Sequence, residues 1–297
     1  MATIGRTVPE LPDLAVVVDA FHVALAGRTL QSATAIGPIA VRGTPAELEG
    51  LRGQRLVAVR RRGKFVELVF VRDRVVVNAM LTGRFQLAPP VTKLPAKTTV
   101  VLGFGPRDGA PRGAARWTRG AAWLPPDDAP TEVRYRDPTQ MGKVYLAPAG
   151  VARAIPGFDD ALGPDADDPA LTIEAWRDRI RRHPGELKPL LRNQAFVAGI
   201  GNAYSDEILH AARLSPFRTR ASLASEEVDE LYRAMRDTLE RSIETLRRRV
   251  PPTFETQVRD FLAVHRRGGD PCPRCGTRIS EVSSRSEATS WCRGCQR

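Results

Sequence analysis

The four cysteines of the chain lie near its C-terminal end in two pairs, Cys272-x2-Cys275 and Cys292-x2-Cys295. Two such pairs supply four thiolates, which is the donor set of a tetrahedral Zn²⁺ site. Two disulfides would use the same sulfur atoms, but a chain without a secretion signal favours metal binding. Four thiolates fill the coordination shell and leave no position for water, so we expect one structural zinc ion per chain and not a catalytic one.

A glycine turn, Gly199-Ile-Gly201, separates two segments with helical spacing of apolar residues, and Asn202 follows it. The start of a helix presents free backbone N–H groups and a partial positive charge, which together suit a phosphate. Simple packing of two helices would also explain the turn. Gly201 and Asn202 are therefore candidate phosphate-binding residues in a helix–two-turn–helix pattern.

The first half of the chain is predicted to contain one helix and many short strands. Apolar residues at intervals of three and four predict a helix over residues 13–27. Short β-rich runs then indicate a mostly antiparallel sandwich or barrel. We expect its strands at residues 55–60, 64–71, 74–79, 98–102 and 143–146. The segment 105–131 is rich in Gly, Pro, Ala and Arg and is interpreted as a long surface insertion.

The second half is predicted to be helical. Residues 147–169 are rich in proline and aspartate and serve as a linker, and helices are expected at residues 172–183, 186–198 and 202–212. A longer helix begins at a Ser225 cap and ends before Pro251. Strands followed by helices give an α+β protein with more than one domain.

The charge of the chain points to a polyanion as its partner. Its 297 residues carry 45 Lys and Arg against 34 Asp and Glu, a net charge of +11. Nucleic acid is the usual partner of such a basic protein, although charge also keeps proteins in solution. No apolar run approaches the ~20 residues of a membrane span. We therefore expect a soluble, cytoplasmic protein that has no membrane partner.

Several segments resemble the formamidopyrimidine-DNA glycosylase/endonuclease VIII family, and they occur in the family's order from Pro9 to Gln296. These segments are Pro9-Glu-Leu-Pro-Asp13, the RRGKF run ending at Phe65, Leu81-Thr-Gly83, Asp137-Pro-Thr-Gln-Met-Gly142, VAGIGNAYSDEIL around Asn202, and the paired cysteines. The resemblance implies an N-terminal β-sandwich domain with a flanking helix (9–146), the linker (147–169), a helix–two-turn–helix domain (170–265) and a zinc finger (266–297). Double-stranded damaged DNA would be bound between them by a monomer, on the bacterial nucleoid.

The resemblance also implies a chemistry, which is removal of a damaged base followed by cleavage at the abasic site. In the family, an N-terminal proline is a secondary amine that attacks C1′ of a flipped nucleotide, and the resulting Schiff base leads to strand cleavage by elimination. Pro9 would be this nucleophile, and its free α-amine would be partly neutral at pH 7. Glu10 would be the general acid and base at the sugar oxygen. Lys64, among arginines, would face a phosphate.

The remaining expected contacts to DNA are of two kinds. Lys188, Gly201 and Asn202 would hold phosphates, whereas Leu81, Gln140 and Met141 would occupy the gap left by the flipped base. The sequence departs from the family in the 137–142 loop, where two Arg and a Phe are common, and Thr139 cannot form the fork of an Arg.

The zinc finger shows a second departure. Glu287 stands where the family has an arginine that grips phosphates at the lesion, and we expect Arg285 to substitute for it. Because the segments that choose the damaged base are the ones that differ, the preferred lesion is left open.

The segment before Pro9 bears directly on the mechanism. With residues 1–8 attached, the Pro9 nitrogen is an amide and cannot form a Schiff base. Initiation at the Val8 codon followed by removal of Met would free it, so we expect residues 1–8 to be a misassigned start or a trimmed leader. The alternatives are that the protein is a non-catalytic binder of damaged or abasic DNA, or that Lys64 supplies the amine.

Overall fold

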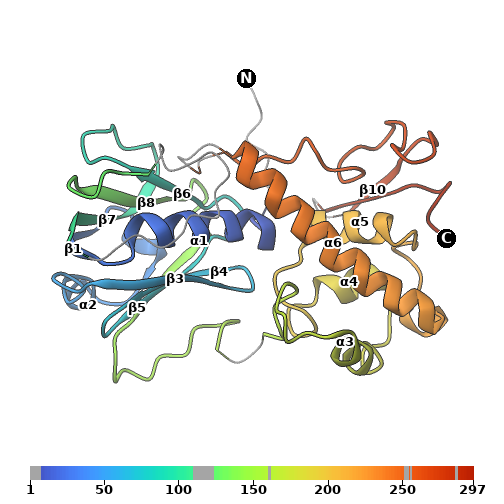
Figure 1. Ribbon diagram of the computed structural model, residues 1–297, viewed down its shortest axis with the longest axis horizontal. Coiled ribbons are helices and arrows are strands. Elements are labelled where there is room, and N and C mark those ends of the chain that lie inside the picture. The colour runs from blue at the N-terminus through green and yellow to red at the C-terminus, as the bar shows by residue number, and fades with distance from the viewer. Residues whose placement is uncertain (1–7, 110–123, 160–161, 251–253, 255, 285–286) are drawn as a thin grey trace. The chain divides into compact units, whose positions relative to one another are not determined.

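The computed structural model describes residues 8–109, 124–159, 162–250, 254, 256–284 and 287–297. The chain divides into two compact units (Figure 1). Unit 1 comprises Met1–Ile155 and Thr245–Val258, and unit 2 comprises Pro156–Glu244 and Arg259–Arg297. Across the described ranges, no helix is both long enough and apolar enough to cross a bilayer.

Unit 1 contains two sheets, which confirms the β-rich N-terminal domain of an α+β fold. The first sheet has the order β1-β7-β8-β6 and is antiparallel throughout. Its strands are β1 (Arg28–Ala35), β7 (Thr98–Arg107), β8 (Thr131–Arg136) and β6 (Arg84–Ala88). The second has the order β2-β9-β5-β4-β3 and is antiparallel except for the β2–β9 pair. Its strands are β2 (Val41–Arg42), β9 (Lys143–Ala147), β5 (Arg74–Asn78), β4 (Phe65–Phe70) and β3 (Leu56–Arg62).

Helix α1 (Leu11–Leu25) begins and ends two residues before the predicted bounds of 13–27, and it packs against β3 and β4. Pro12 suits its first turn because a proline there loses no helical hydrogen bond. Most of its side chains are buried, and Phe21 contacts the edges of Phe85 and Phe254. Burial on nearly every side fixes α1 firmly in unit 1, and with it the residues that precede it. The short elements of the unit are α2 (Pro45–Glu49) and a 3₁₀ turn, Pro38–Ala40.

The predicted strands correspond to β3, β4, β5, β7 and β9, whereas β1, β6 and β8 were not predicted. The prediction of a surface insertion over 105–131 needs correction at both ends, because β7 reaches Arg107 and β8 begins at Thr131. The buried Arg28 guanidinium donates to the carbonyl oxygens of Gly105, Pro126 and Ala129 at 2.7–2.9 Å. Residues 110–123, the middle of the expected insertion, lie outside the described residues.

Unit 2 is helical apart from its C-terminal hairpin. Its helices are α3 (Ile173–Ile180), α4 (Leu187–Arg192), α5 (Asn202–Ala211) and most of α6 (Ser225–Arg249), with a 3₁₀ turn at Arg220–Ser222. The residues of α6 from Thr245 onward belong to unit 1. The hairpin pairs β10 (Ser280–Ser284) with β11 (Glu287–Trp291). Buried Trp176 of α3 donates its indole N–H to the Val228 carbonyl of α6, 3.0 Å away. The helical second domain is thereby confirmed.

Helix α4 is shorter than the predicted 186–198. The chain leaves the helix at Asn193, whose side-chain oxygen accepts the Ala195 N–H at 3.0 Å. Ala198 then pairs in parallel with Asp165, through hydrogen bonds from Ala198 N to Pro164 O and from Ala166 N to Ala198 O. The end of the predicted linker is therefore an ordered part of unit 2, and it braces the segment that leads into the glycine turn.

Candidate nucleic-acid and catalytic sites

The four cysteine sulfurs converge at the C-terminal hairpin, and their Sγ atoms all lie within 4.8 Å of one another. The Cys272–Cys295 and Cys275–Cys292 Sγ separations are 3.8 and 3.4 Å. Zinc–sulfur bonds of about 2.3 Å in a tetrahedron require sulfur separations close to these values. Hydrogen bonds from Thr277 lower the pKa of Cys275 to about 6, which favours the thiolate. The cluster fits one structural zinc ion, as the sequence predicts.

His210 lies against this cluster although no sequence pattern pointed to it. Its Nε2 is 3.3 Å from Cys272 Sγ, and its backbone carbonyl accepts a hydrogen bond from Arg274 at 2.8 Å. Burial lowers the pKa of His210 to about 4, so the ring is neutral at pH 7. The contact joins α5 to the metal-binding loops.

The glycine turn of unit 2 is held by Gln194. Its amide nitrogen donates to the carbonyl oxygens of Arg192 and Ile200, both at 2.8 Å, and its oxygen accepts the Gly199 N–H at 2.9 Å. Gly199 has φ of 104°, a conformation that side chains disfavour. Helix α5 then starts at Gly201 without a side-chain cap. The partial positive charge at this end of α5 favours an anion.

Asn202 opens α5 and also contacts the zinc hairpin. Its Nδ2 donates to the Ala288 carbonyl of β11 at 2.8 Å. This bond orients the side chain and leaves the second amide hydrogen for another acceptor. The structure therefore brings predicted residues Gly201 and Asn202 together beside β11.

Lys188 is placed differently from the prediction, which had it holding a phosphate. The side chain is buried, and its ammonium lies 2.7 Å from Asp206 Oδ1, 2.8 Å from Ala288 O and 3.0 Å from Thr289 Oγ1. An ammonium has three donors, and these three acceptors satisfy them. Burial lowers the pKa of Lys188, and Asp206 opposes that shift. Lys188 ties α4 to α5 and to the zinc hairpin inside unit 2.

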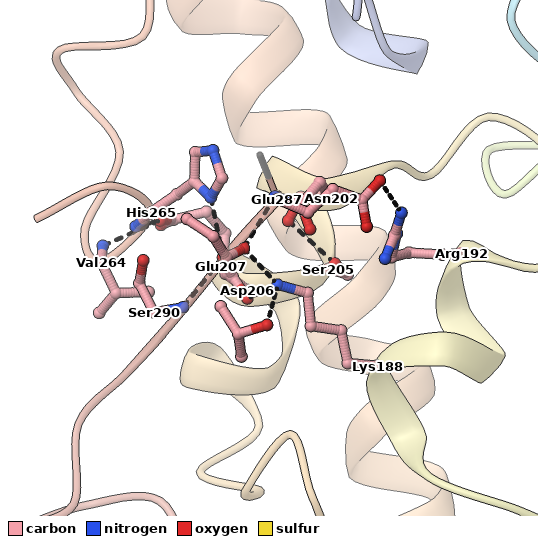
Figure 2. Close-up of polar contacts among 12 residues, drawn as sticks. Lys188, Arg192, Asn202, Ser205, Asp206, Glu207, Val264, His265, Glu287 and Ser290 are labelled. Carbon is pink, nitrogen blue, oxygen red and sulfur yellow. Dashed lines mark hydrogen bonds and ion pairs between the residues drawn. The ribbon is translucent and has the colours of Figure 1, made fainter. Parts of the chain in front are cut away.

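The two acidic residues that follow in α5 also face inward (Figure 2). Asp206 Oδ2 is 2.8 Å from Nδ1 of His265. Glu207 accepts the backbone N–H groups of Ala263, Val264 and His265 at 2.7–2.9 Å, and burial raises its pKa. Carboxylates that are buried as deeply as these need partners, and here both residues have them.

At the zinc hairpin, Glu287 forms an ion pair with Arg192 at the end of α4. The distance from Glu287 Oε1 to Arg192 Nη2 is 2.6 Å, and the side chains are 54% and 32% exposed. Sequence reasoning singled out Glu287 and missed Arg192, because the partners are remote in the chain. Arg285, the expected substitute for a phosphate-binding arginine, lies outside the described residues.

In unit 1, the second sheet gathers several predicted residues at one end. Phe65 pairs with Asn78, and Asn78 pairs with Lys143. The turn that joins β3 to β4, the segment after β5 and the segment before β9 therefore lie at the same end of the sheet. Lys64 is in that turn, where Gly63 has φ of 56° as a two-residue hairpin requires. Leu81, Gln140 and Met141 are in the other two segments.

Buried Asp137 organises the 137–142 loop at this end. Its carboxylate accepts the Gly142 N–H at 2.6 Å and hydrogen bonds from the Thr82 and Thr139 hydroxyls. Thr139 also lies 2.6 Å from Thr82, oxygen to oxygen. Thr139 thus fastens the loop to the segment after β5 instead of reaching outward. The apolar Met141 side chain remains 47% exposed at the loop tip.

Glycines allow the two segments to approach. A Cβ on Gly83 or Gly142 would overlap the hydroxyl of Tyr135, which lies between them. Burial raises the pKa of Tyr135 well above its ordinary value, so it stays a neutral phenol. The lack of space beside Tyr135 explains why the Leu81-Thr-Gly83 and 137–142 segments each carry a glycine where they come close together.

Pro9 lies in a pocket of unit 1 that adjoins this end of the sheet. Asp13, Gly83, Arg84 and Gln257 also line the pocket. The Glu10 N–H donates to Asp13 Oδ2 at 2.8 Å, and the Gln257 amide donates to the same oxygen at 3.2 Å. Glu10 is buried at the start of α1. The predicted nucleophile Pro9 thus lines the same pocket as Gly83, which belongs to the segment that carries Leu81.

Comparisons with known families match nearly the whole chain. Residues 8–144 match the N-terminal domain of formamidopyrimidine-DNA glycosylase, residues 162–250 its H2TH domain, and residues 269–297 a zinc finger found in FPG and IleRS. The zinc-finger match agrees with the geometry of the four cysteines, and the zinc prediction is confirmed.

Curated relatives and solved structures agree with these matches. The chain is 30% identical to the formamidopyrimidine-DNA glycosylase of Heliobacterium modesticaldum, over 97% of this chain and 100% of that protein. It is 28% identical to the one from Pelotomaculum thermopropionicum, over 97% and 99%. The MutM (Fpg) protein of Thermus thermophilus matches with 28% identity and a TM-score of 0.76, over 97% and 98%. The Fpg of Lactococcus lactis, in a complex with DNA that contains an abasic site, shares the fold at 22% identity and a TM-score of 0.79, over 97% and 99%. The chain therefore belongs to the formamidopyrimidine-DNA glycosylase/endonuclease VIII family.

Proposed function

We propose that this protein is a DNA glycosylase of base excision repair that also cleaves the strand at the resulting abasic site. The observation that carries the proposal is the placement of Pro9 in a pocket with Asp13 and Arg84, next to the sheet end that bears Lys64, Leu81 and Met141. Family membership and the names of the relatives support it. The substrate would be double-stranded damaged DNA on the nucleoid, bound by a monomer.

The chemistry follows from a free amine at Pro9. The nitrogen lone pair attacks C1′ of the damaged nucleotide, and the bond from C1′ to the base breaks with its electron pair on the base, which takes up the proton lost by the nitrogen. Glu10 delivers a proton to the sugar oxygen as the ring opens, which leaves an iminium between Pro9 and C1′. Loss of a proton from C2′ and departure of the 3′ phosphate then cut the strand, and water releases Pro9.

Extrusion of the nucleotide costs a few kcal/mol. Contacts to the DNA backbone and side chains inserted in the base stack offset this cost. Met141 and Leu81 are apolar side chains suited to insertion between bases. The Gly201–Asn202 turn and Lys64 supply phosphate contacts. Gln140 adjoins Met141 with φ of 54° and would face the unpaired partner base.

The mechanism requires a secondary amine, and the Pro9 nitrogen is an amide when Val8 precedes it. The active form in this proposal begins at Pro9, through initiation at the Val8 codon or through trimming. The test compares a form that begins Met-Pro9 with the full-length protein, each incubated with abasic duplex DNA and borohydride. The short form is expected to be trapped covalently through its N-terminal residue, and the full-length protein is not.

A form beginning Met-Lys-Pro9 is the matched control, because a retained initiator Met blocks the nitrogen with the least added chain. Equal trapping of blocked and free forms would refute the role of Pro9 and point to Lys64. A short form that binds abasic DNA but is never trapped would favour the second candidate function, a non-catalytic binder. That candidate is favoured by Thr139 and Glu287, which stand where the family has cations.

A further inference from the structure

The Arg192–Glu287 ion pair lies beside the proposed phosphate site and has no role in the mechanism above. We propose that Arg192 is a phosphate-binding residue of the DNA site, and that the Glu287 carboxylate occupies its guanidinium when DNA is absent. This inference rests on the proposed function, because it names a further DNA contact of the same unit.

Two independent contacts place Arg192 at the glycine turn. Its backbone carbonyl accepts the Gln194 amide, the same group that donates to Ile200 within the turn. Its side chain reaches Glu287, whose neighbour Ala288 accepts the Asn202 amide. Arg192 and Asn202 therefore engage adjacent residues of β11, and Figure 2 shows the contact of Arg192 with Glu287. A phosphate at the α5 N-terminus would lie within reach of both.

The nearby cation Lys188 does not take this role. Lys188 is nearest in the sequence, but its ammonium is buried and its three donors are satisfied by Asp206, Ala288 and Thr289. Arg192 is partly exposed, and its contact with Glu287 is the one hydrogen bond that its guanidinium makes among the described residues. A guanidinium presents five donors in a planar fork that matches a phosphate, so most of its binding capacity remains.

The pair is suited to exchange. Exposed ion pairs contribute little to stability because solvent screens them, so separating Arg192 from Glu287 costs little. A phosphate that replaces the carboxylate retains the charge pairing and adds a favourable interaction with the dipole of α5. The freed Glu287 side chain is more than half exposed and returns to solvent. Glu287 thus acts as a built-in competitor that lowers the affinity for DNA.

The test measures binding of the full-length, zinc-loaded protein to a duplex with a tetrahydrofuran abasic analogue, which cannot be cleaved. Arg192→Ala is expected to weaken binding about tenfold, the loss of one charge-assisted contact. It should also reduce the slope of log affinity against log salt by about 0.9. Glu287→Gln is expected to tighten binding about threefold, the effect of removing one nearby like charge.

The double variant Arg192→Ala with Glu287→Gln distinguishes a direct contact of Arg192 with a phosphate from neutralisation of Glu287 by Arg192. If Arg192 contacts a phosphate, Arg192→Ala weakens binding in the Glu287→Gln background as well. If Arg192 only neutralises Glu287, its removal has no effect there, and the proposal is overturned. It is also overturned if Arg192→Ala binds as tightly as the parent protein.

The matched control is Arg177→Ala, which removes the same charge from another ion pair of unit 2, with Asp229, in which the arginine side chain is 48% exposed. It should leave binding unchanged within about twofold, since it lacks a phosphate contact. Equal zinc content of all variants shows that the hairpin is intact. Because the analogue needs no amine for binding, failure of borohydride trapping at Pro9 would leave this result standing, and the reverse also holds.

Discussion

Lys188 shows how a charge can serve the fold while lying next to a binding site. It neutralises buried Asp206 and donates to the zinc hairpin. Lys188→Met should lower the free energy of unfolding of unit 2 by about 3 kcal/mol, because it leaves Asp206 as an uncompensated buried charge. Urea unfolding would measure this loss. Arg181→Met, at an exposed ion pair, is the control and should change stability by less than about 0.5 kcal/mol.

A loss below about 1 kcal/mol in Lys188→Met would mean that Asp206 is stabilised without the ammonium.

The direction in which Lys188 points could not be predicted from the sequence. The helical spacing is compatible with either an exposed or a buried lysine, and the three acceptors come from segments distant in the chain. Arg192 was missed for the same reason, because its partner Glu287 lies on β11, far away in the chain.

At the scale of elements, the zinc hairpin supports the glycine turn. Ala288 of β11 accepts hydrogen bonds from both Lys188 and Asn202, so the turn depends on the hairpin being folded. Cys272→Ala or Cys292→Ala is expected to remove zinc and weaken DNA binding while unit 1 stays folded. Metal analysis, a DNA-binding titration and limited proteolysis would measure the zinc content, the affinity and the folding of unit 1, with Ser283→Ala as the control. Full zinc occupancy in either cysteine variant would contradict the assignment.

The elements were predictable where one pattern dominated. Apolar spacing placed α1, α5 and α6, and runs of valine placed β5 and β7. Strand β8 was missed because Arg134 lies within it, and the sequence does not show that carbonyl oxygens of Pro89, Thr92 and Lys93 bind that buried guanidinium. Local patterns record burial by apolar residues, whereas buried cations depend on tertiary partners.

At the scale of the whole molecule, the decisive property is a net charge of +11. Some of the 45 Lys and Arg side chains are already paired with carboxylates within the units, as Arg28, Arg134 and Lys188 show, so the number of cations does not count phosphate contacts. The salt dependence of binding does count them, since each neutralised phosphate contributes about 0.9 to the slope of log affinity against log salt concentration.

The logarithm of the affinity for the uncleavable abasic duplex should fall linearly with the logarithm of the salt concentration. Variants such as Lys64→Ala and Arg192→Ala should each lower the slope by about one contact, whereas Arg177→Ala should not. An affinity independent of salt would refute backbone-driven binding, whatever the outcome at Pro9.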